Sequence, residues 1–264
     1  MELAPPTIWM PPKPALIRAG GDLLNLAAVP GVSGIGGFGS NAKKFNFLNA
    51  YEVSARGFSP VTGAGGSALE LMVVISIGHG SNTGSGSIPD PRPMVSTPVG
   101  WSLANSDTGL YSFNSGFTDG AQKSGDTCAI HYKRLDGTET ATANFLTAGI
   151  NPTFRTVALR LQGGGSISVH GQHNQVSTGD PSPHILAASA LVSPTICISV
   201  RYGNSSFATF SPSPNATYSY GSVGARPAVA GFKIYNDAGL DTTVDAGSPG
   251  TAVPCVFISC ILKG

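Results

Sequence analysis

Charged residues are scarce in this chain. Only 11% of its 264 residues are Asp, Glu, Lys or Arg, less than half the usual fraction, and the formal net charge is +1. The basic residues are scattered, and Lys43-Lys44 and Lys133-Arg134 are the basic doublets. Proteins that bind nucleic acids usually gather Lys and Arg on one face, so we expect no direct binding to DNA or RNA.

Long hydrophobic runs are also missing. No apolar stretch approaches the roughly 20 residues that a membrane-spanning helix needs, so we expect no membrane insertion. The first residues, Met-Glu-Leu-Ala-Pro-Pro, lack the basic start and unbroken apolar segment of a secretory signal peptide. The usual export route is therefore not expected.

Cysteine is rare and its spacing does not indicate a metal site. Cys255 and Cys260 form a C-x4-C pair without a second close pair, which is a poor zinc signature. All four cysteines, the other two being Cys128 and Cys197, lie among Ile, Val and Ala. We expect buried thiols that act as small hydrophobic side chains, with a disulfide between strands as the alternative.

Catalytic and cofactor motifs are equally hard to find. The chain has no G-x-S-x-G, and its 14 acidic residues are dispersed, several of them at turns. Residues 34–39 formally match G-x-G-x-x-G but lie outside any strand–helix unit, so they predict a flexible joint. We therefore expect no enzyme, no cofactor and no metal.

The histidines do not alter that expectation. His170, His173 and His184 fall in a Gly/Ser/Pro-rich stretch that offers no rigid element to fix metal ligands. His131 alternates with Ile130 and Tyr132, which predicts a side chain that faces solvent or a cross-strand partner.

Glycine, proline and short apolar clusters are abundant. The chain has 35 Gly and 20 Pro and is still 41% hydrophobic, which is typical of many short strands joined by tight turns. We predict an all-β fold, an antiparallel, jelly-roll-like β-sandwich over residues 45–264, without an internal repeat. Residues 69–77 (LELMVVISI) predict a central strand buried on both faces. The other predicted strands are 45–58, 101–103, 185–190, 195–202, 217–223, 229–235 and 253–262, and residues 78–98, 110–125 and 163–184 are predicted loops.

Residues 126–163 carry the clearest local signal. Apolar residues alternate over 128–132, an Asp136-Gly137 corner and an alternating Thr/Glu/Thr run follow, and residues 157–161 form a second apolar stretch. Asp-Gly between alternating segments favours a β-hairpin turn, because both residues tolerate a positive φ. The pattern predicts a hairpin and resembles no catalytic scaffold.

Residues 1–44 differ from the rest of the chain. The proline-rich start predicts an extended arm, residues 16–28 predict one short helix, and residues 30–40 are Gly-rich. Such a segment cannot build its own core, so its apolar residues need a partner to cover them. We expect a docking arm that uses Ile8, Trp9, Met10, Leu16 and Ile17; the alternative is an arm that folds back or stays disordered.

From residue 69 onward the chain resembles a family of β-sandwich modules in tailed-bacteriophage virion proteins. The likeness rests on the apolar 69–77 strand, Pro98-Val99-Gly100-Trp101-Ser102-Leu103, the strand over 128–134, the corner at 136–140 and residues 157–163. It covers roughly residues 50–264 and is clearest over 98–163. Modules of this family are non-enzymatic parts of tail fibres, tail tips, neck appendages or capsid decorations.

The resemblance implies a virion structural protein. We expect it to contact other virion proteins, with many copies in a symmetric homo-oligomeric array. The alternative is a host-surface carbohydrate- or receptor-binding module that uses Trp101 or Tyr111 as stacking faces. A glycan hydrolase ranks last, because no pair of acids is singled out.

Overall fold

The computed structural model describes residues 18–19, 22–23, 44–53, 56–58, 69–84, 89–114, 121–139, 141–147, 149–177, 194–203, 216–223, 226–236 and 255–264. The chain divides into two units, Met1–Ala42 and Lys43–Gly264. The boundary lies two residues before the predicted one, which followed residue 44. In the first unit, β1 (Arg18–Ala19) pairs antiparallel with β2 (Asp22–Leu23). The helix predicted over 16–28 is therefore wrong at these residues.

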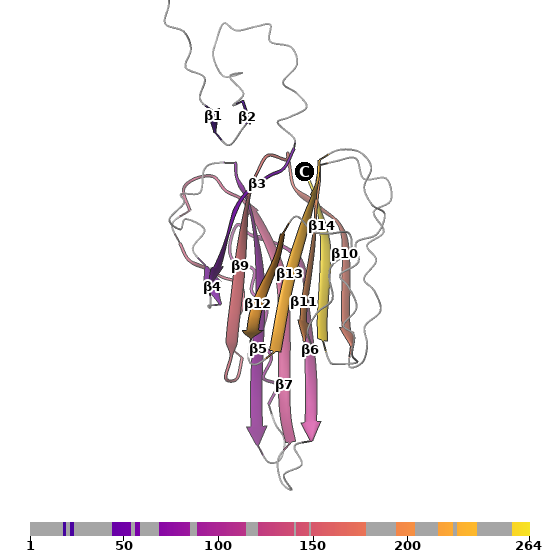
Figure 1. Cartoon of the computed structure of the whole chain (residues 1–264). Coiled ribbons are helices and arrows are strands. Elements are labelled where there is room, and N and C mark those ends of the chain that lie inside the picture. Colours follow the sequence, from indigo (N-terminus) through magenta and orange to yellow (C-terminus); the bar gives the residue numbers. More distant parts are fainter. Residues whose placement is uncertain are drawn as a thin grey trace, which may run out of the picture. The chain divides into compact units, whose positions relative to one another are not determined.

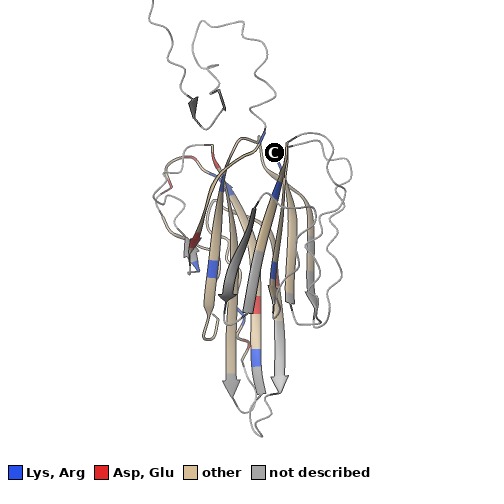
Figure 2. Ribbon diagram, viewed as in Figure 1, with Lys and Arg blue, Asp and Glu red and all other residues tan. Residues whose placement is uncertain are grey.

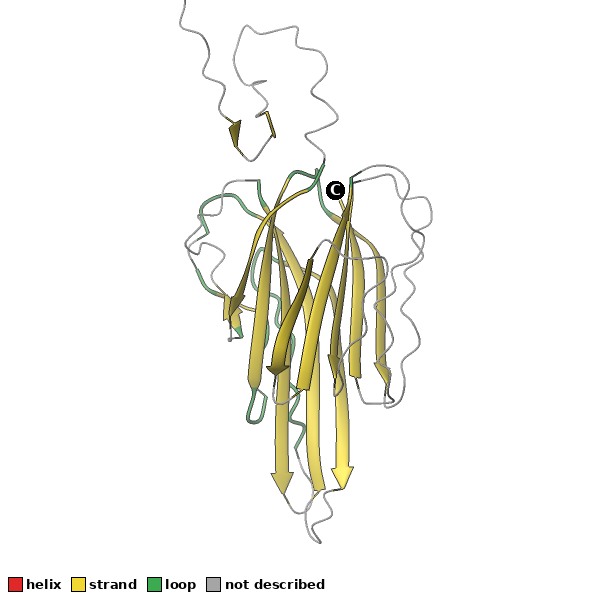
Figure 3. Ribbon diagram, viewed as in Figure 1, coloured by secondary structure: helices red, strands yellow, loops and turns green. Residues whose placement is uncertain are grey.

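The second unit is built from two five-stranded antiparallel sheets (Figures 1 and 3). The first sheet has the order β3 (Asn46–Val53), β9 (Thr153–Gln162), β5 (Leu71–Gly84), β7 (Ala121–Arg134) and β6 (Ser102–Asn114). The second has the order β10 (Ser168–Ser177), β14 (Cys255–Lys263), β11 (Thr195–Gly203), β13 (Arg226–Tyr235) and β12 (Ala216–Val223). A small sheet pairs β4 (Gly57–Phe58) with β8 (Ala143–Asn144). The predicted all-β antiparallel sandwich is confirmed.

The two sheets repeat one strand order. When the strands of each sheet are numbered along the chain, both sheets have the spatial order 1-5-2-4-3. Each sheet comes from one continuous half of the domain, which differs from the interleaved strands of a jelly roll although the two-layer architecture is the same. Equivalent cross-strand positions carry hydroxyl pairs: Ser76 with Thr156 at 3.4 Å and Ser199 with Ser259 at 3.0 Å. The sequence showed no internal repeat, so this shared strand order is visible only in the fold.

The main core lies between the sheets. Its members alternate along the facing strands, as the period of two in a strand requires. They include Leu71, Val73, Ile75 and Ile77 of β5, Val157, Leu159 and Leu161 of β9, Ile196, Ile198 and Val200 of β11, and Val256, Ile258 and Leu262 of β14.

A second apolar cluster covers the outer face of the first sheet. Met72 and Val74 of β5 and Ala158 of β9 pack there with Trp101, Leu135, Ala143 and Phe145. Strand β5 is consequently buried on both faces over residues 71–77, as predicted, whereas Leu69 precedes the strand and is 74% exposed. This explains its nearly continuous apolar sequence.

A segment of chain, residues 90–96, crosses the same outer face and is called the crossing segment below. It lies against Gly78 and Gly80 of β5 and Gly125 of β7, where a Cβ atom would collide with Pro93, Pro91 and Arg92 respectively. These glycines sit inside strands, because β5 continues to Gly84 and β7 begins at Ala121. The loops predicted over 78–98 and 110–125 are therefore wrong at residues 78–84, 110–114 and 121–125. The loop predicted over 163–184 is likewise wrong at β10.

The predicted hairpin at Asp136-Gly137 is also wrong. Gly137 has φ +87°, so the corner exists, but β7 pairs with β5 and β6 and not with the strand that follows. The Glu139 carboxylate instead accepts backbone N–H bonds from Asp136 (2.9 Å) and Gly137 (3.1 Å) and closes a compact loop. The chain then returns as β9 beside β5.

Candidate functional site

One end of the sandwich brings together the points where the chain enters and leaves it. Phe45 donates its backbone N–H to Asn236 Oδ1 (2.7 Å), and Asn236 Nδ2 donates back to the Phe45 carbonyl (2.8 Å). A Cβ on Gly264 would lie 2.7 Å from Phe45 Cζ, so the last residue lies against the same ring. We call this the Phe45 end. It fixes where an arm over residues 1–44 joins the domain.

Arg134 organises the backbone at the Phe45 end. Its guanidinium donates to the carbonyls of Leu69 (2.7 Å), Gly163 (2.8 Å) and Gly165 (2.8 Å), and so ties the start of β5 to the turn that follows β9. Partial burial lowers the pKa of this guanidinium. Gly163, at φ +89°, turns the chain out of β9 at a point where any side chain would overlap the Lys44 carbonyl.

Two ion pairs brace the sheet near this end. Arg160 Nε donates to Glu70 Oε2 at 2.7 Å, its Nη2 makes a second bond to the same oxygen, and its Nη1 donates to Tyr51 Oη at 3.0 Å. Lys133 Nζ lies 3.1 Å from Glu139 Oε1. Burial raises the pKa of Glu139, but the Asp136 backbone bond and Lys133 outweigh it, so the net pKa lies below its ordinary value. Charged residues are sparse along the strands (Figure 2), so each of these ion pairs stabilises only its own part of the sheet.

A histidine–aspartate pair lies on the inner face of the first sheet. His79 Nδ1 is 2.7 Å from Asp126 Oδ1 across β5 and β7, and the ring meets Tyr202 edge-on with centroids 6.4 Å apart. Catalytic triads use this contact to orient an imidazole toward a nucleophile. Only 7% of His79 is exposed, and its bond to Asp126 joins the neighbouring strands β5 and β7. Within the described part of the chain, the pair braces these two strands.

The sequence did not predict this pair, although it contains His79 among its histidines. The partners are 47 residues apart, and only the β5·β7 register makes them opposite neighbours. To predict the pair from the sequence, residues 121–126 would have to be recognised as a strand. Their polar, Gly-containing pattern conceals this.

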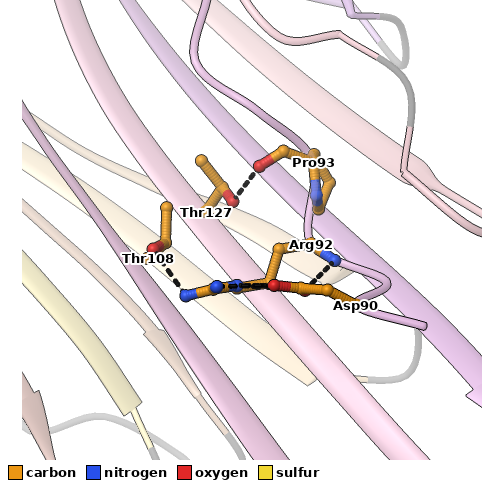
Figure 4. A network of polar contacts seen from close by, with 5 residues as sticks. All are labelled: Asp90, Arg92, Pro93, Thr108 and Thr127. Carbon is orange, nitrogen blue, oxygen red and sulfur yellow. Dashed lines mark hydrogen bonds and ion pairs between the residues drawn. The ribbon is translucent and has the colours of Figure 1, made fainter. Parts of the chain in front are cut away.

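The crossing segment holds another polar cluster (Figure 4). Asp90 accepts bonds from the Arg92 backbone N–H (2.9 Å) and from Nε (2.8 Å), and Arg92 Nη1 donates to Thr108 Oγ1 (3.2 Å). Thr127 Oγ1 donates to the Pro93 carbonyl at 2.5 Å. The Arg92 side-chain bond lowers the pKa of Asp90. The Arg92–Thr108 and Thr127–Pro93 bonds hold the segment on the sheet.

The structure describes only some of the residues that were predicted to bind partners. Ile8, Trp9, Met10, Leu16 and Ile17 lie outside the described residues. Trp101 is 8% exposed and packs edge-on against Phe145, with centroids 4.8 Å apart, so its prediction as a glycan contact is wrong. Tyr111 lies on β6 opposite Ser124, and its side chain is outside the description.

His131, Cys197 and Cys260 are buried in the structure. His131 was predicted to face solvent or a cross-strand partner, and the first alternative is wrong. The side chain is fully buried, with its ring 5.0 Å from that of Phe145 and Nε2 3.4 Å from Thr97 Oγ1. Cys197 and Cys260 are buried thiols outside any disulfide, as expected. Burial raises the pKa of Cys197 to about 12, so it is unreactive at neutral pH.

Within the described part of the chain, no helix has the length and hydropathy to span a bilayer, and no group of three or more His, Cys, Asp or Glu side chains has metal-binding geometry. Comparisons of the chain with protein-family models, with curated proteins and with solved structures gave no match.

Proposed function

We propose that this chain is a non-enzymatic structural protein of a tailed-bacteriophage particle. Residues 1–44 bind another virion protein, and the β-sandwich projects from the particle. The proposal starts from the resemblance of residues 69–163 to virion β-sandwich modules. The positions of the resembling residues in the fold support the proposal.

The observation that carries the proposal is that the resembling motifs assemble into one structural unit. The 69–77, 128–134 and 157–163 stretches are central strands of the first sheet. Trp101 of the Gly-Trp motif and Leu135, next to the Asp-Gly corner, pack in the cluster on its outer face. Side chains of these motifs thus serve packing and loop closure, which suits a building block better than a catalytic module.

The direction of the domain also suits a projecting role. The chain enters at the Phe45 end, whereas β5, β6 and β7 extend past the second sheet at the opposite end (Figure 1). An arm bound to the particle would leave that far end exposed. Prolines lower the ordering cost of an extended arm, and many copies in an array compensate for weak single contacts.

Deleting residues 1–42 tests the arm. The sandwich has its own core, so the truncated protein should stay folded with an unchanged melting temperature, while its copy number in purified particles should fall to background. A full-length variant with Ile8, Trp9 and Met10 changed to Ser should lose incorporation in the same way. Normal copy number for both variants would contradict the role of the arm.

Binding to host-surface glycans is the second proposal, and it has lost Trp101 as a contact residue. A glycan array probed with the purified protein tests it, with Tyr111→Ala as the matched variant. Binding that the variant abolishes would favour this function, and an array without signal would remove it.

A further inference from the structure

We propose that the edge of β6 over residues 109–114 pairs with the same edge of a second copy of this chain. The two edges run antiparallel about a two-fold axis at Ser112 and join two first sheets into one continuous sheet. This contact uses only strands of the sandwich domain, so it does not depend on the virion role proposed above. Three features of the edge support it: where it is sealed, how it is charged and how it matches itself.

The second sheet seals the first half of the β6 edge. Because β6 is the outermost strand of the first sheet, alternate residues turn their backbone N–H and C=O groups away from β7. The Gln172 side-chain amide donates to the Ala104 carbonyl, and the Asn174 amide donates to the Ser106 carbonyl at 2.8 Å. Both amides belong to β10, the outermost strand of the facing sheet. The next residue of this series, Val176, has no side-chain donor.

Side chains of β6 itself seal the N–H groups along the same stretch. The Ser106 N–H donates to Asn105 Oδ1 (2.9 Å), and the Thr108 N–H donates to Asp107 Oδ1 (2.7 Å). Even-numbered residues of β6 therefore point their backbone groups outward. Of the bonds that the described residues make to this edge, the last is at Thr108. Beyond it the strand continues to Asn114, where β5, β6 and β7 extend past the second sheet (Figure 1).

The other edges of the sheets are protected. On the β5 side of the extended strands, the Ser81 N–H donates to the Ile150 carbonyl (2.9 Å), and the Ser81 carbonyl accepts a bond from Asn151 Nδ2 (3.3 Å). The outermost strands β3, β10 and β12 each contain a register shift, which disturbs edge pairing. Strand β6 instead pairs with β7 without a shift from Asn105 to Asn114.

The charge of the edge permits pairing with itself. Residues 109–114 contain no charged residue and no proline, the usual devices that keep edges apart. Asp90 and Arg92, whose guanidinium reaches Thr108, pair with each other. Lys123 is opposite Ser112 on β7, so the two copies of this lysine are about 14 Å apart, three strand spacings and beyond the screening length. Two copies of the edge therefore meet without close like charges.

The outward residues of this stretch match themselves. They are Leu110, Ser112 and Asn114, which are symmetric about Ser112. In an antiparallel pair centred there, Ser112 is opposite its own copy, and Leu110 of each chain is opposite Asn114 of the other. Each such pair exchanges two backbone hydrogen bonds, so this one register uses every outward group past Thr108. A two-fold contact of this kind is closed and gives a dimer.

Hydrogen exchange on the full-length protein tests the contact. The N–H groups of Leu110, Ser112 and Asn114 should exchange about tenfold more slowly at high protein concentration than at low, because the second edge protects them. The Ser81 N–H, which is bonded within each copy, should exchange at one rate. Rates independent of concentration for the three edge groups would overturn the contact. Protection that appears only in the presence of another protein would overturn the second copy as partner.

Two lysine variants locate the contact on the strand. Ser112→Lys places two like charges directly opposite each other at the axis, so the concentration dependence should disappear. Ser106→Lys is the matched control, because Ser106 is also an outward residue of β6 but lies in the sealed half. Both variants should melt like the wild type, and the control should keep the dependence. A Ser112→Lys variant that keeps it would count against this edge.

Cysteine cross-linking tests the register. Under mild oxidation, Ser112→Cys should form a covalent dimer, because the Cα atoms of opposed residues are about 5.5 Å apart, within the range of a disulfide. Leu110→Cys is the matched control on the same strand, since it lies roughly 13 Å along the strand from its own copy. The wild type gives the background from native thiols, of which Cys128, Cys197 and Cys260 are buried. Equal dimer yields for the two variants would indicate random collision and overturn the register.

Discussion

The contact between the crossing segment and the first sheet gives the sharpest stability prediction. In Gly80→Ala, the new Cβ would lie 2.8 Å from the Pro91 carbonyl carbon, closer still to its oxygen, and 3.2 Å from the Ile150 carbonyl oxygen. Carbon atoms in contact are normally about 3.5–4.0 Å apart, so the segment must move by roughly 1 Å. Both obstructing groups are backbone and cannot rotate away.

That movement weakens the bonds that hold the segment. They are Ile150 N–H to the Pro91 carbonyl (3.3 Å), Thr127 Oγ1 to the Pro93 carbonyl (2.5 Å) and Thr147 N–H to the Met94 carbonyl (2.8 Å). Each such bond contributes about 0.5–1.5 kcal/mol, so losing two or three should cost about 1–4.5 kcal/mol. At about 2–4 °C per kcal/mol for a domain of this size, the melting temperature should fall by about 2–18 °C.

Thermal unfolding followed by circular dichroism measures the effect, and Gly171→Ala is the matched control. Gly171 also lies in a strand, but its nearest neighbour to a new Cβ is Ile261 Cδ1 at an ordinary 3.8 Å. The control should be neutral or gain up to about 1 kcal/mol by restricting the unfolded chain. Equal melting temperatures for the two variants would refute the close approach of residues 90–96 to β5.

Two further predictions concern buried charge. Glu70→Gln removes the carboxylate from the buried Arg160 and should cost about 3–5 kcal/mol in urea unfolding, whereas Glu52→Gln in the exposed pair with Arg155 should cost less than about 1 kcal/mol; similar losses would show that the inner pair is solvated. Burial lowers the pKa of His131 from 6.5 to about 4, against the opposing Ser96 backbone bond. Its neutral ring therefore contributes stability that is complete above pH 6.5 and is lost as the pH falls from 6.5 to 4. His131→Gln should flatten that part of the stability–pH curve, and an unchanged curve would place the titration elsewhere.

The strands that could be predicted are those with a strong apolar pattern. Residues 69–77 gave the central strand, and 195–202, 217–223 and 229–235 fall within β11, β12 and β13. Strand β10 and the extensions of β5, β6 and β7 were missed because they mix Gly with polar residues and lack a strong apolar pattern. Glycine there makes room for the crossing segment, a requirement that no local pattern reveals. For the same reason, Trp101 was predicted as a surface aromatic when a second apolar layer in fact covers it.

The sequence by itself determined the class of the fold, because alternating and continuous apolar runs between Gly and Pro corners can bury their side chains only as stacked sheets. It also marked residues 1–44 as a segment of different composition. Only the tertiary structure decided that both sheets follow one strand order, that His79 meets Asp126, and that Trp101 packs in a second apolar cluster. Each of these depends on strand register and long-range pairing, which bring together residues that are far apart in the chain.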